Sequence, residues 1–161
     1  MAYKASRQIA AGVSTIHPSQ GNALVPVIAE YVFTAPLLVN DVIEMLGVSS
    51  QMILVDAAVI CDDLDTGAGI VLDVGVLSGS YGKPLNDDNV TQRTCGNEIL
   101  AGTTIGQTGG VAPMNKATAA FITPTPVPFS LGFKIVAIPA GFIANTRLRL
   151  VAYLVPAPTA M

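Results

Sequence analysis

Apolar and polar residues alternate with a period of two in three segments of this chain. These segments are Gly69–Leu77, Leu131–Ile138 and Thr146–Val155. In the last of them, apolar side chains at even positions oppose Arg147 and Arg149 at odd positions. Successive side chains of a strand point to opposite faces of a sheet, so this alternation predicts three half-buried β-strands.

The segment Met52–Asp63 has a different pattern, because it is apolar at both parities. One parity holds Ile53, Val55, Ala57, Val59 and Cys61, and the other holds Leu54, Ala58 and Ile60. A strand that is apolar on both faces is covered on both faces. We therefore expect a partner sheet on one side of this strand and a second surface on the other.

Two further strand candidates and then two with weaker patterns bring the total to about eight. They are Leu24–Thr34, Asp41–Val48, Val90–Cys95 and Ala119–Thr123. Helix has little room, because 15 glycines and 11 prolines are spread along the chain. One helical turn is predicted at Asn97–Ala101. The alternate prolines of Thr123–Phe129 predict an extended polyproline-like connection.

Many short strands without helices predict an all-β, single-domain β-sandwich, and a jelly roll is the common eight-stranded form. We place the sandwich domain at residues 22–155. An N-terminal arm at 1–21 and a C-terminal tail at 156–161 flank it, since neither shows a packing period. We also expect that deleting Met1–Gln8 leaves the domain folded.

The composition indicates that part of the surface is covered by other protein. The chain has 161 residues, of which 51% are hydrophobic and 12% are charged. Typical domains carry about 25% charged residues. The centres of protein–protein interfaces are depleted of charge, so an oligomer or a larger assembly accounts for this composition.

Membrane and nucleic-acid partners are not supported. The two longest apolar stretches, Leu24–Val39 and Gly132–Ala144, are interrupted by charge and proline, and residues 1–8 lack the apolar run of a secretory signal. The net charge is −3, and Arg147 with Arg149 is too small a basic cluster for phosphate binding.

No set of residues predicts catalysis. The single histidine, His17, has Ser14 and Ser19 nearby, but no orienting carboxylate or nucleophile motif accompanies them. We interpret His17 as an exposed loop residue and predict a non-enzymatic protein without cofactors. Cys61 and Cys95 are predicted to be free, buried thiols.

Two acidic clusters raise the question of a metal site. Asp62, Asp63 and Asp65 precede a glycine-rich stretch, with Asp73 beyond, but the residues do not match a calcium-loop template. Aspartate and glycine are favoured in turns, so we predict a β-hairpin turn here. The cluster Asn86–Asn89 is likewise predicted to be a loop, and no metal ligands are assigned.

Five segments together resemble the head decoration (cement) proteins of tailed double-stranded-DNA bacteriophages. They are Asn40–Leu46, Val55–Gly67, Leu72–Val76, Ile99–Gly110 and Arg147–Tyr153. Each alone is a turn or strand pattern, and the set is what resembles the family. The resemblance spans about residues 40–153, while the proline-bearing front segment and the tail depart from it.

The resemblance implies a β-sandwich, often trimeric, that is assembled in the host cytoplasm, sits on the outer capsid surface and bridges capsid subunits. The implied partners are the major capsid protein and further copies of the chain, and the family has no catalytic residues to transfer. Two other interpretations stay open at this point. One is a phage tail, neck or fibre component, and the other is a carbohydrate- or receptor-binding module.

Overall fold

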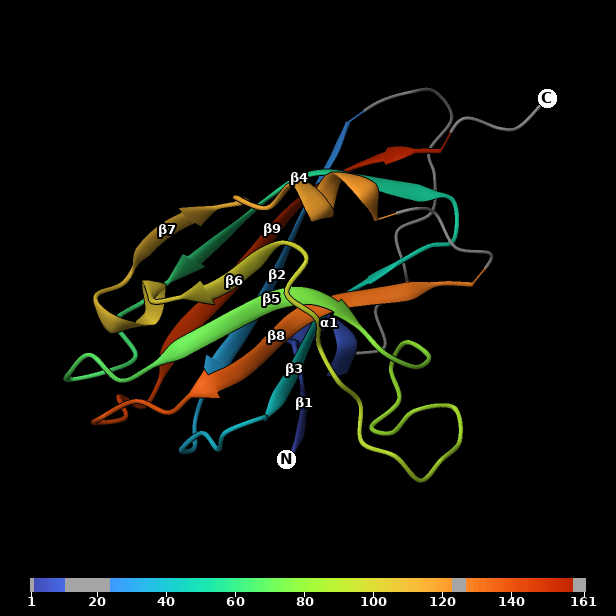
Figure 1. The fold of residues 1–161 in the computed structure, drawn as a ribbon. Coiled ribbons are helices and arrows are strands. Elements are labelled where there is room, and N and C mark those ends of the chain that lie inside the picture. The colour runs from blue at the N-terminus through green and yellow to red at the C-terminus, as the bar shows by residue number, and fades with distance from the viewer. Residues whose placement is uncertain (1, 11–23, 123–126, 158–161) are drawn as a thin grey trace.

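Two β-sheets face each other in the computed structural model, which describes residues 2–10, 24–122 and 127–157 (Figure 1). One sheet has the strand order β1-β3-β8-β5-β6 and the other has the order β2-β9-β4-β7. The strands are β1 (Tyr3–Ala5), β2 (Val25–Phe33), β3 (Val42–Val48), β4 (Met52–Cys61), β5 (Val71–Leu77), β6 (Leu100–Thr103), β7 (Gly110–Pro113), β8 (Phe129–Ala137) and β9 (Thr146–Pro156). The described residues also form three short helices, namely α1 (Arg7–Ala10), η1 (Ile105–Gln107) and η2 (Ala117–Phe121).

The connections make this sandwich a jelly roll. From β2 to β5 the chain alternates between the sheets, β6 pairs with β5, and β7, β8 and β9 alternate again. The pairs among β2 to β9 are all antiparallel. This is the double Greek-key order of an eight-stranded jelly roll. The predicted all-β, jelly-roll-like sandwich is therefore confirmed.

The alternation seen in the sequence determines which side chains enter the core. In β9, Leu148, Leu150, Ala152 and Leu154 are fully buried, while the odd positions face away from the other sheet. In β8, Leu131, Phe133 and Ile135 are buried in the same way. Burying a leucine or phenylalanine side chain contributes about 1.5–3 kcal/mol. The strands predicted at Leu24–Thr34, Asp41–Val48, Gly69–Leu77, Leu131–Ile138 and Thr146–Val155 are confirmed as β2, β3, β5, β8 and β9.

The strand predicted at Met52–Asp63 is present as β4, and a β-bulge interrupts its regular alternation. Its register against β9 shifts between Leu54 and Asp56. Leu54 before the shift and Ala57 after it are both buried, whereas Val55 and Asp56 between them are exposed. The bulge therefore moves the inward-facing positions from even to odd numbers. The parity that holds Val55 and Ala57 therefore does not lie on one face of the strand, because Val55 is exposed and Ala57 is buried.

Three weaker predictions are also wrong. Val90–Cys95 lies in a loop, because Asp88 Oδ1 accepts from the amides of Val90 and Thr91 and folds the chain back. Residues 119–122, the described part of the strand predicted at Ala119–Thr123, overlap the end of η2 instead of forming a strand, which fits the alanine content. Asn97–Ala101 is not helical, because the amide of Ile99 bonds to Val74 O as the chain enters β6. Residues 123–126 of the predicted polyproline segment lie outside the described residues.

The segment predicted as an arm contributes to the fold. Its β1 pairs in parallel with β3, with Tyr3 opposite Val42 and Ala5 opposite Glu44. The amide of Ser6 continues this ladder by bonding to Glu44 O. Residues 11–23 lie outside the described residues, so the boundary of an arm stays a prediction.

Candidate interaction surfaces

The outer face of the β2-β9-β4-β7 sheet carries apolar side chains in rows across the strands. The pairing register aligns one row as Ile28, Val151, Ala58 and Pro113, and the next as Glu30, Arg149, Ile60 and Val111. The exposed fractions are 56% for Ile28, 38% for Ile60 and 62% for Val111. With Pro26, Val55 and Tyr153 these residues form a surface that we call the sheet face.

Charges at one end of the sheet face are paired within the chain. Arg149 Nε lies 2.7 Å from Glu30 Oε2 on β2. Arg147 Nε lies 3.2 Å from Asp62 Oδ2, which follows β4. The sequence showed that these two arginines are too few for a nucleic-acid-binding surface. In the structure their ion pairs link neighbouring strands. They give the apolar sheet face a polar border.

The loop at residues 78–98, which joins β5 to β6, covers part of the outer face of the other sheet and projects beyond the sandwich (Figure 1). The buried guanidinium of Arg93 anchors this loop. Its Nη1 lies 2.7 Å from Glu44 Oε1 on β3, and its Nη2 donates to Ser130 Oγ on β8. The ring of Tyr81 lies over Gly47, where a Cβ would collide with it.

Sequence reasoning did not single out this buried ion pair. The available signal was Glu44 itself, a charged residue inside the apolar segment Asp41–Val48. A buried charge is paired or hydrogen-bonded, so a basic partner elsewhere was required. Nothing in the sequence distinguished Arg93 from the other basic residues as that partner.

The N-terminal strand is held by the same cluster. Tyr3 donates its hydroxyl to Glu44 Oε2 at 2.6 Å, and Lys4 Nζ lies 3.1 Å from Asp41 Oδ2. Burial acts to raise the pKa of Asp41, but hydrogen bonds from the Leu38 and Ala2 amides, together with Lys4, outweigh it and hold that pKa below its usual value. Burial and the Glu44 carboxylate raise the pKa of Tyr3. Both pKa shifts arise from contacts that Asp41 and Tyr3 make in the folded structure.

The first acidic cluster forms a turn that closes one end of the sandwich. The buried carboxylate of Asp65 accepts from the amides of Gly67, Gly69, Ile70 and Gly141. Burial acts to raise the pKa of Asp65, but these hydrogen bonds outweigh it and hold the pKa well below its usual range. The turn links β4 to β5 in the opposite sheet, so the predicted hairpin is wrong although the predicted turn is present.

The other carboxylates of this cluster point to separate partners. Asp62 pairs with Arg147, Asp63 Oδ1 accepts from the Asp65 amide, and Asp73 Oδ2 lies 3.0 Å from Lys134 Nζ. Within residues 2–10, 24–122 and 127–157, no group of three or more His, Cys, Asp or Glu side chains is arranged to hold a metal ion. The second acidic cluster lies in the 78–98 loop, as predicted.

A second exposed apolar surface lies around the start of β3 and the end of β8. It consists of Leu38, Val39, Val136 and Ile138, with exposed fractions between 39% and 60%. The amide of Asn40 bonds to Ile135 O, so the two chain segments are adjacent. We call these four residues the loop-end patch. The sequence pattern did not reveal it, because its members come from two segments distant in sequence, the connection before β3 and the end of β8.

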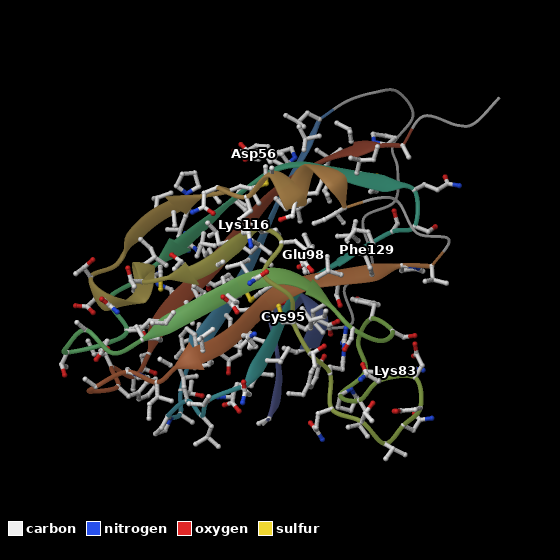
Figure 2. All side chains as sticks on the ribbon, viewed as in Figure 1. Asp56, Lys83, Cys95, Glu98, Lys116 and Phe129 are labelled. Carbon is white, nitrogen blue, oxygen red and sulfur yellow. The ribbon has the colours of Figure 1, made fainter. Side chains whose placement is uncertain are left out.

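Figure 2 labels side chains on several different elements of the fold. Asp56 lies beside β4, and Lys83 lies well apart from it on the 78–98 loop. Cys95 belongs to that loop and is buried in a small cluster with Val42 and Leu77, whereas Cys61 belongs to the core between the sheets. Both cysteines are free and buried, as predicted. Burial raises the pKa of each thiol to about 12.

Two predictions from the sequence remain to be compared with the structure, one about His17 and one about membrane spans. His17, Ser14 and Ser19 lie outside the described residues. Within the described part of the chain, no helix is long and apolar enough to cross a membrane. At least six of the eight basic side chains form ion pairs inside the chain, so little positive charge is left for a partner.

Comparison with known proteins identifies relatives by structure. No protein-family model matches the chain, and no curated protein sequence matches it. A chain in the structure of the capsid of Ralstonia phage GP4 has a TM-score of 0.87 and 31% sequence identity, covering 98% of this chain and 100% of that chain. A chain in the Cyanophage Pam1 capsid asymmetric unit has a TM-score of 0.64 and 19% identity, covering 89% and 93%. The second likeness shows a shared fold.

Proposed function

Because the chain belongs to the family of bacteriophage capsid proteins that includes its relative from the Ralstonia phage GP4 capsid, we propose that it is a decoration protein that binds the outer surface of a capsid and bridges capsid subunits. The observation that carries this proposal is the 31% identity over the full length of a capsid chain. The five segments that resemble decoration proteins support the finer assignment. The proposed partners are the major capsid protein and two further copies of this chain, and the proposed location is the virion.

The proposed mechanism is the physical linking of neighbouring capsid subunits. A protein that bridges subunits must hold more than one partner at once, and the structure presents two exposed apolar surfaces on different elements, the sheet face and the loop-end patch. The Asp65 turn and the Arg93–Glu44 pair hold the connections of the sandwich in place. A rigid body transmits force between its two contacts. Repetition over the equivalent sites of a shell adds avidity to each weak contact.

Binding to isolated capsids tests this function. Tailless heads that lack the protein are mixed with the recombinant full chain and sedimented, and bound protein is measured along with the temperature at which the shells break. We expect saturable binding at a fixed ratio to the major capsid protein and a higher breakage temperature. Cryo-electron microscopy of the saturated heads then shows whether the added density lies on the outer surface between neighbouring subunits.

The other outcomes separate the alternatives. Binding to purified tails but not to heads would assign the chain to the tail or neck. Binding to glycans on an array, without binding to either particle, would assign it to a receptor-binding module. Density on the inner surface of the shell would overturn the decoration role and keep the capsid assignment.

A further inference from the structure

The 78–98 loop connects β5 to β6 and projects beyond the sandwich (Figure 1). Connections longer than about 12–15 residues are uncommon in compact domains, and those that are ordered are usually functional. We propose that this loop inserts its tip, residues 86–91 with Val90 as the anchor, into an apolar socket with a basic border on the major capsid protein. The inference rests on the proposed function and deepens it, because it names the element that binds the shell and the chemistry of the surface that receives it.

Hydrogen bonds inside the loop fix its shape before any partner binds. Asn86 accepts at Oδ1 from Ser78 Oγ. The same side chain donates through Nδ2 to Thr91 Oγ1 and to Gln92 O. An antiparallel bridge joins Leu85 to Gln92 and closes the loop below its tip. A binding loop that already has its bound shape loses little conformational entropy on association.

The tip presents an apolar side chain to solvent. Val90 is 78% exposed, which is the largest exposed fraction among the large hydrophobic side chains that the structure describes. Asp88 Oδ1 accepts from the amides of Val90 and Thr91, and Asp88 Oδ2 accepts from Thr91 Oγ1. The backbone around Val90 is therefore held in place, and its apolar surface stays in water until a partner covers it. Such a projecting apolar residue fits a concave apolar site.

The charge at the tip indicates the border of that site. Asp87 and Asp88 are adjacent there, and Lys83 Nζ lies 3.6 Å from Asp87 Oδ1. Arg93 is neutralised by Glu44 and adds no net charge. One ammonium group thus opposes two carboxylates, and the tip is negative. Electrostatic complementarity favours basic side chains around the socket.

The same charge argues against two other partners. A nucleic acid would bring further negative charge to the tip. A second copy of this chain would have to supply the basic border, but at least six of its eight basic side chains are already in ion pairs. A different protein is favoured, and the proposed function identifies it as the major capsid protein.

The position of the loop suits a protein that links two subunits. The loop follows Leu77 at one end of β5, whereas the loop-end patch adjoins Ala137, which pairs with Val71 at the other end. Seven residues at about 3.3 Å each separate these two ends by roughly 20 Å. The loop and the loop-end patch therefore lie at opposite ends of one sheet, where each can contact a different subunit.

Loop variants of the full chain, tested for binding to heads that lack the protein, measure the role of the anchor. Val90→Thr replaces a methyl group with a hydroxyl that the apolar socket cannot satisfy, so we expect the dissociation constant to rise about 10-fold. Gln92→Ala, on the stem of the same loop, is the matched control. Contacts around an anchor are nearly neutral, so this variant is expected to keep the wild-type affinity. Both positions are exposed, so both variants should keep the wild-type melting temperature.

Crosslinking identifies the partner. Cys61 and Cys95 are buried, so in Gln92→Cys the new thiol can be labelled selectively with a short photoreactive maleimide. After irradiation of saturated heads, mass spectrometry is expected to find an adduct with a lysine- or arginine-containing peptide of the major capsid protein. Ala68→Cys is the control, because Ala68 is exposed near the other end of β5. It is expected not to label the same peptide.

The outcomes separate the loop from the function. The loop's role is overturned, and the decoration role stands, if Val90→Thr binds heads as tightly as the wild type does. An adduct with a second copy of this chain in place of the capsid protein would overturn the assigned partner. Binding is expected to weaken as salt is raised, and affinity independent of salt would contradict the basic border. Failure of the wild type to bind heads would overturn the function itself, and the loop's role with it.

Discussion

Arg93 Nη1 and Glu44 Oε1 lie 2.7 Å apart in an ion pair that is 1% and 0% exposed and joins residues 49 positions apart. The guanidinium also donates to Ser78 O and Lys83 O, and the carboxylate accepts from Tyr3 and Gly82. One buried pair thus connects the 78–98 loop, β3 and β1. Burial of both charges costs solvation, and these additional hydrogen bonds offset part of that cost.

Arg93→Ala is expected to lower the free energy of unfolding by about 3–5 kcal/mol, because it leaves the Glu44 carboxylate buried without its partner. Urea unfolding at pH 7 measures the change. Lys83→Ala is the control, since the Lys83 side chain is 53% exposed and its Nζ lies 3.6 Å from Asp87 Oδ1. That substitution is expected to cost less than about 1 kcal/mol. Equal losses for the two variants would contradict a special role for the buried pair.

Deleting residues 1–6 is expected to destabilise the sandwich, contrary to the expectation from the sequence. The deletion removes β1, the Tyr3–Glu44 hydrogen bond and the Lys4–Asp41 ion pair. Tyr3→Phe removes only the hydroxyl and is expected to cost about 1.5–3 kcal/mol, because that group bonds to a charged carboxylate. Chemical unfolding measures the free energy of unfolding of the two variants and so ranks their losses of stability. A truncated protein with wild-type stability would contradict a stabilising role for β1.

Asp65→Ala is expected to lower the melting temperature at pH 7, because four backbone amides lose their acceptor. Asp63→Ala is the matched control and removes an acceptor from one backbone amide. The pKa of Asp65 is lowered in the folded state, so its contribution is present above about 3.9, the ordinary pKa, and is lost as pH falls further. The gap between wild type and Asp65→Ala should therefore shrink in melts recorded below pH 4. A gap independent of pH would contradict this.

Cys61 and Cys95 are expected to resist a thiol-specific disulfide reagent at pH 8 and to react, with a stoichiometry of two, after unfolding. Each folded-state pKa is raised to about 12, chiefly by burial. The thiols therefore support folding fully below pH 9 and lose that support as pH rises toward 12. A Cys61→Ala and Cys95→Ala double variant should show a shallower loss of stability over that interval. Rapid labelling of native protein would contradict the burial of the thiols.

The parts of the fold that the sequence predicts are those with a long, unbroken period. β5, β8 and β9 follow from alternation because each has one face on the core. β6 and β7 are four residues each and contain glycine, so no period is visible in them. In β4 the bulge at Val55 and Asp56 resets the period, and the sequence carries no mark of that shift.

The candidate surfaces are predictable only in part. The double-sided apolar character of Met52–Asp63 predicts that a second surface covers the outside of β4. Val55 and Ile60 are exposed there in the single chain, so that covering surface stays a prediction. The extent of the sheet face depends on which strands adjoin β4, and sequence order does not reveal that β9 and β7 are its neighbours. The buried pair of Arg93 and Glu44 depends on a contact between distant segments in the same way.

The positions of β8 and β9 have a consequence for how the chain is made. β8 lies between β3 and β5, and β9 lies between β2 and β4, so each sheet is completed by a strand synthesised after its neighbours. The sheet that contains β8 cannot close before synthesis has passed Ala137, and the sheet that contains β9 cannot close before synthesis has passed Pro156. Until then β2 to β5 lack their central partners. Folding is therefore expected to follow synthesis, at the slow rate typical of distant strand pairing. The chain is therefore expected to be fully folded before it binds its partners.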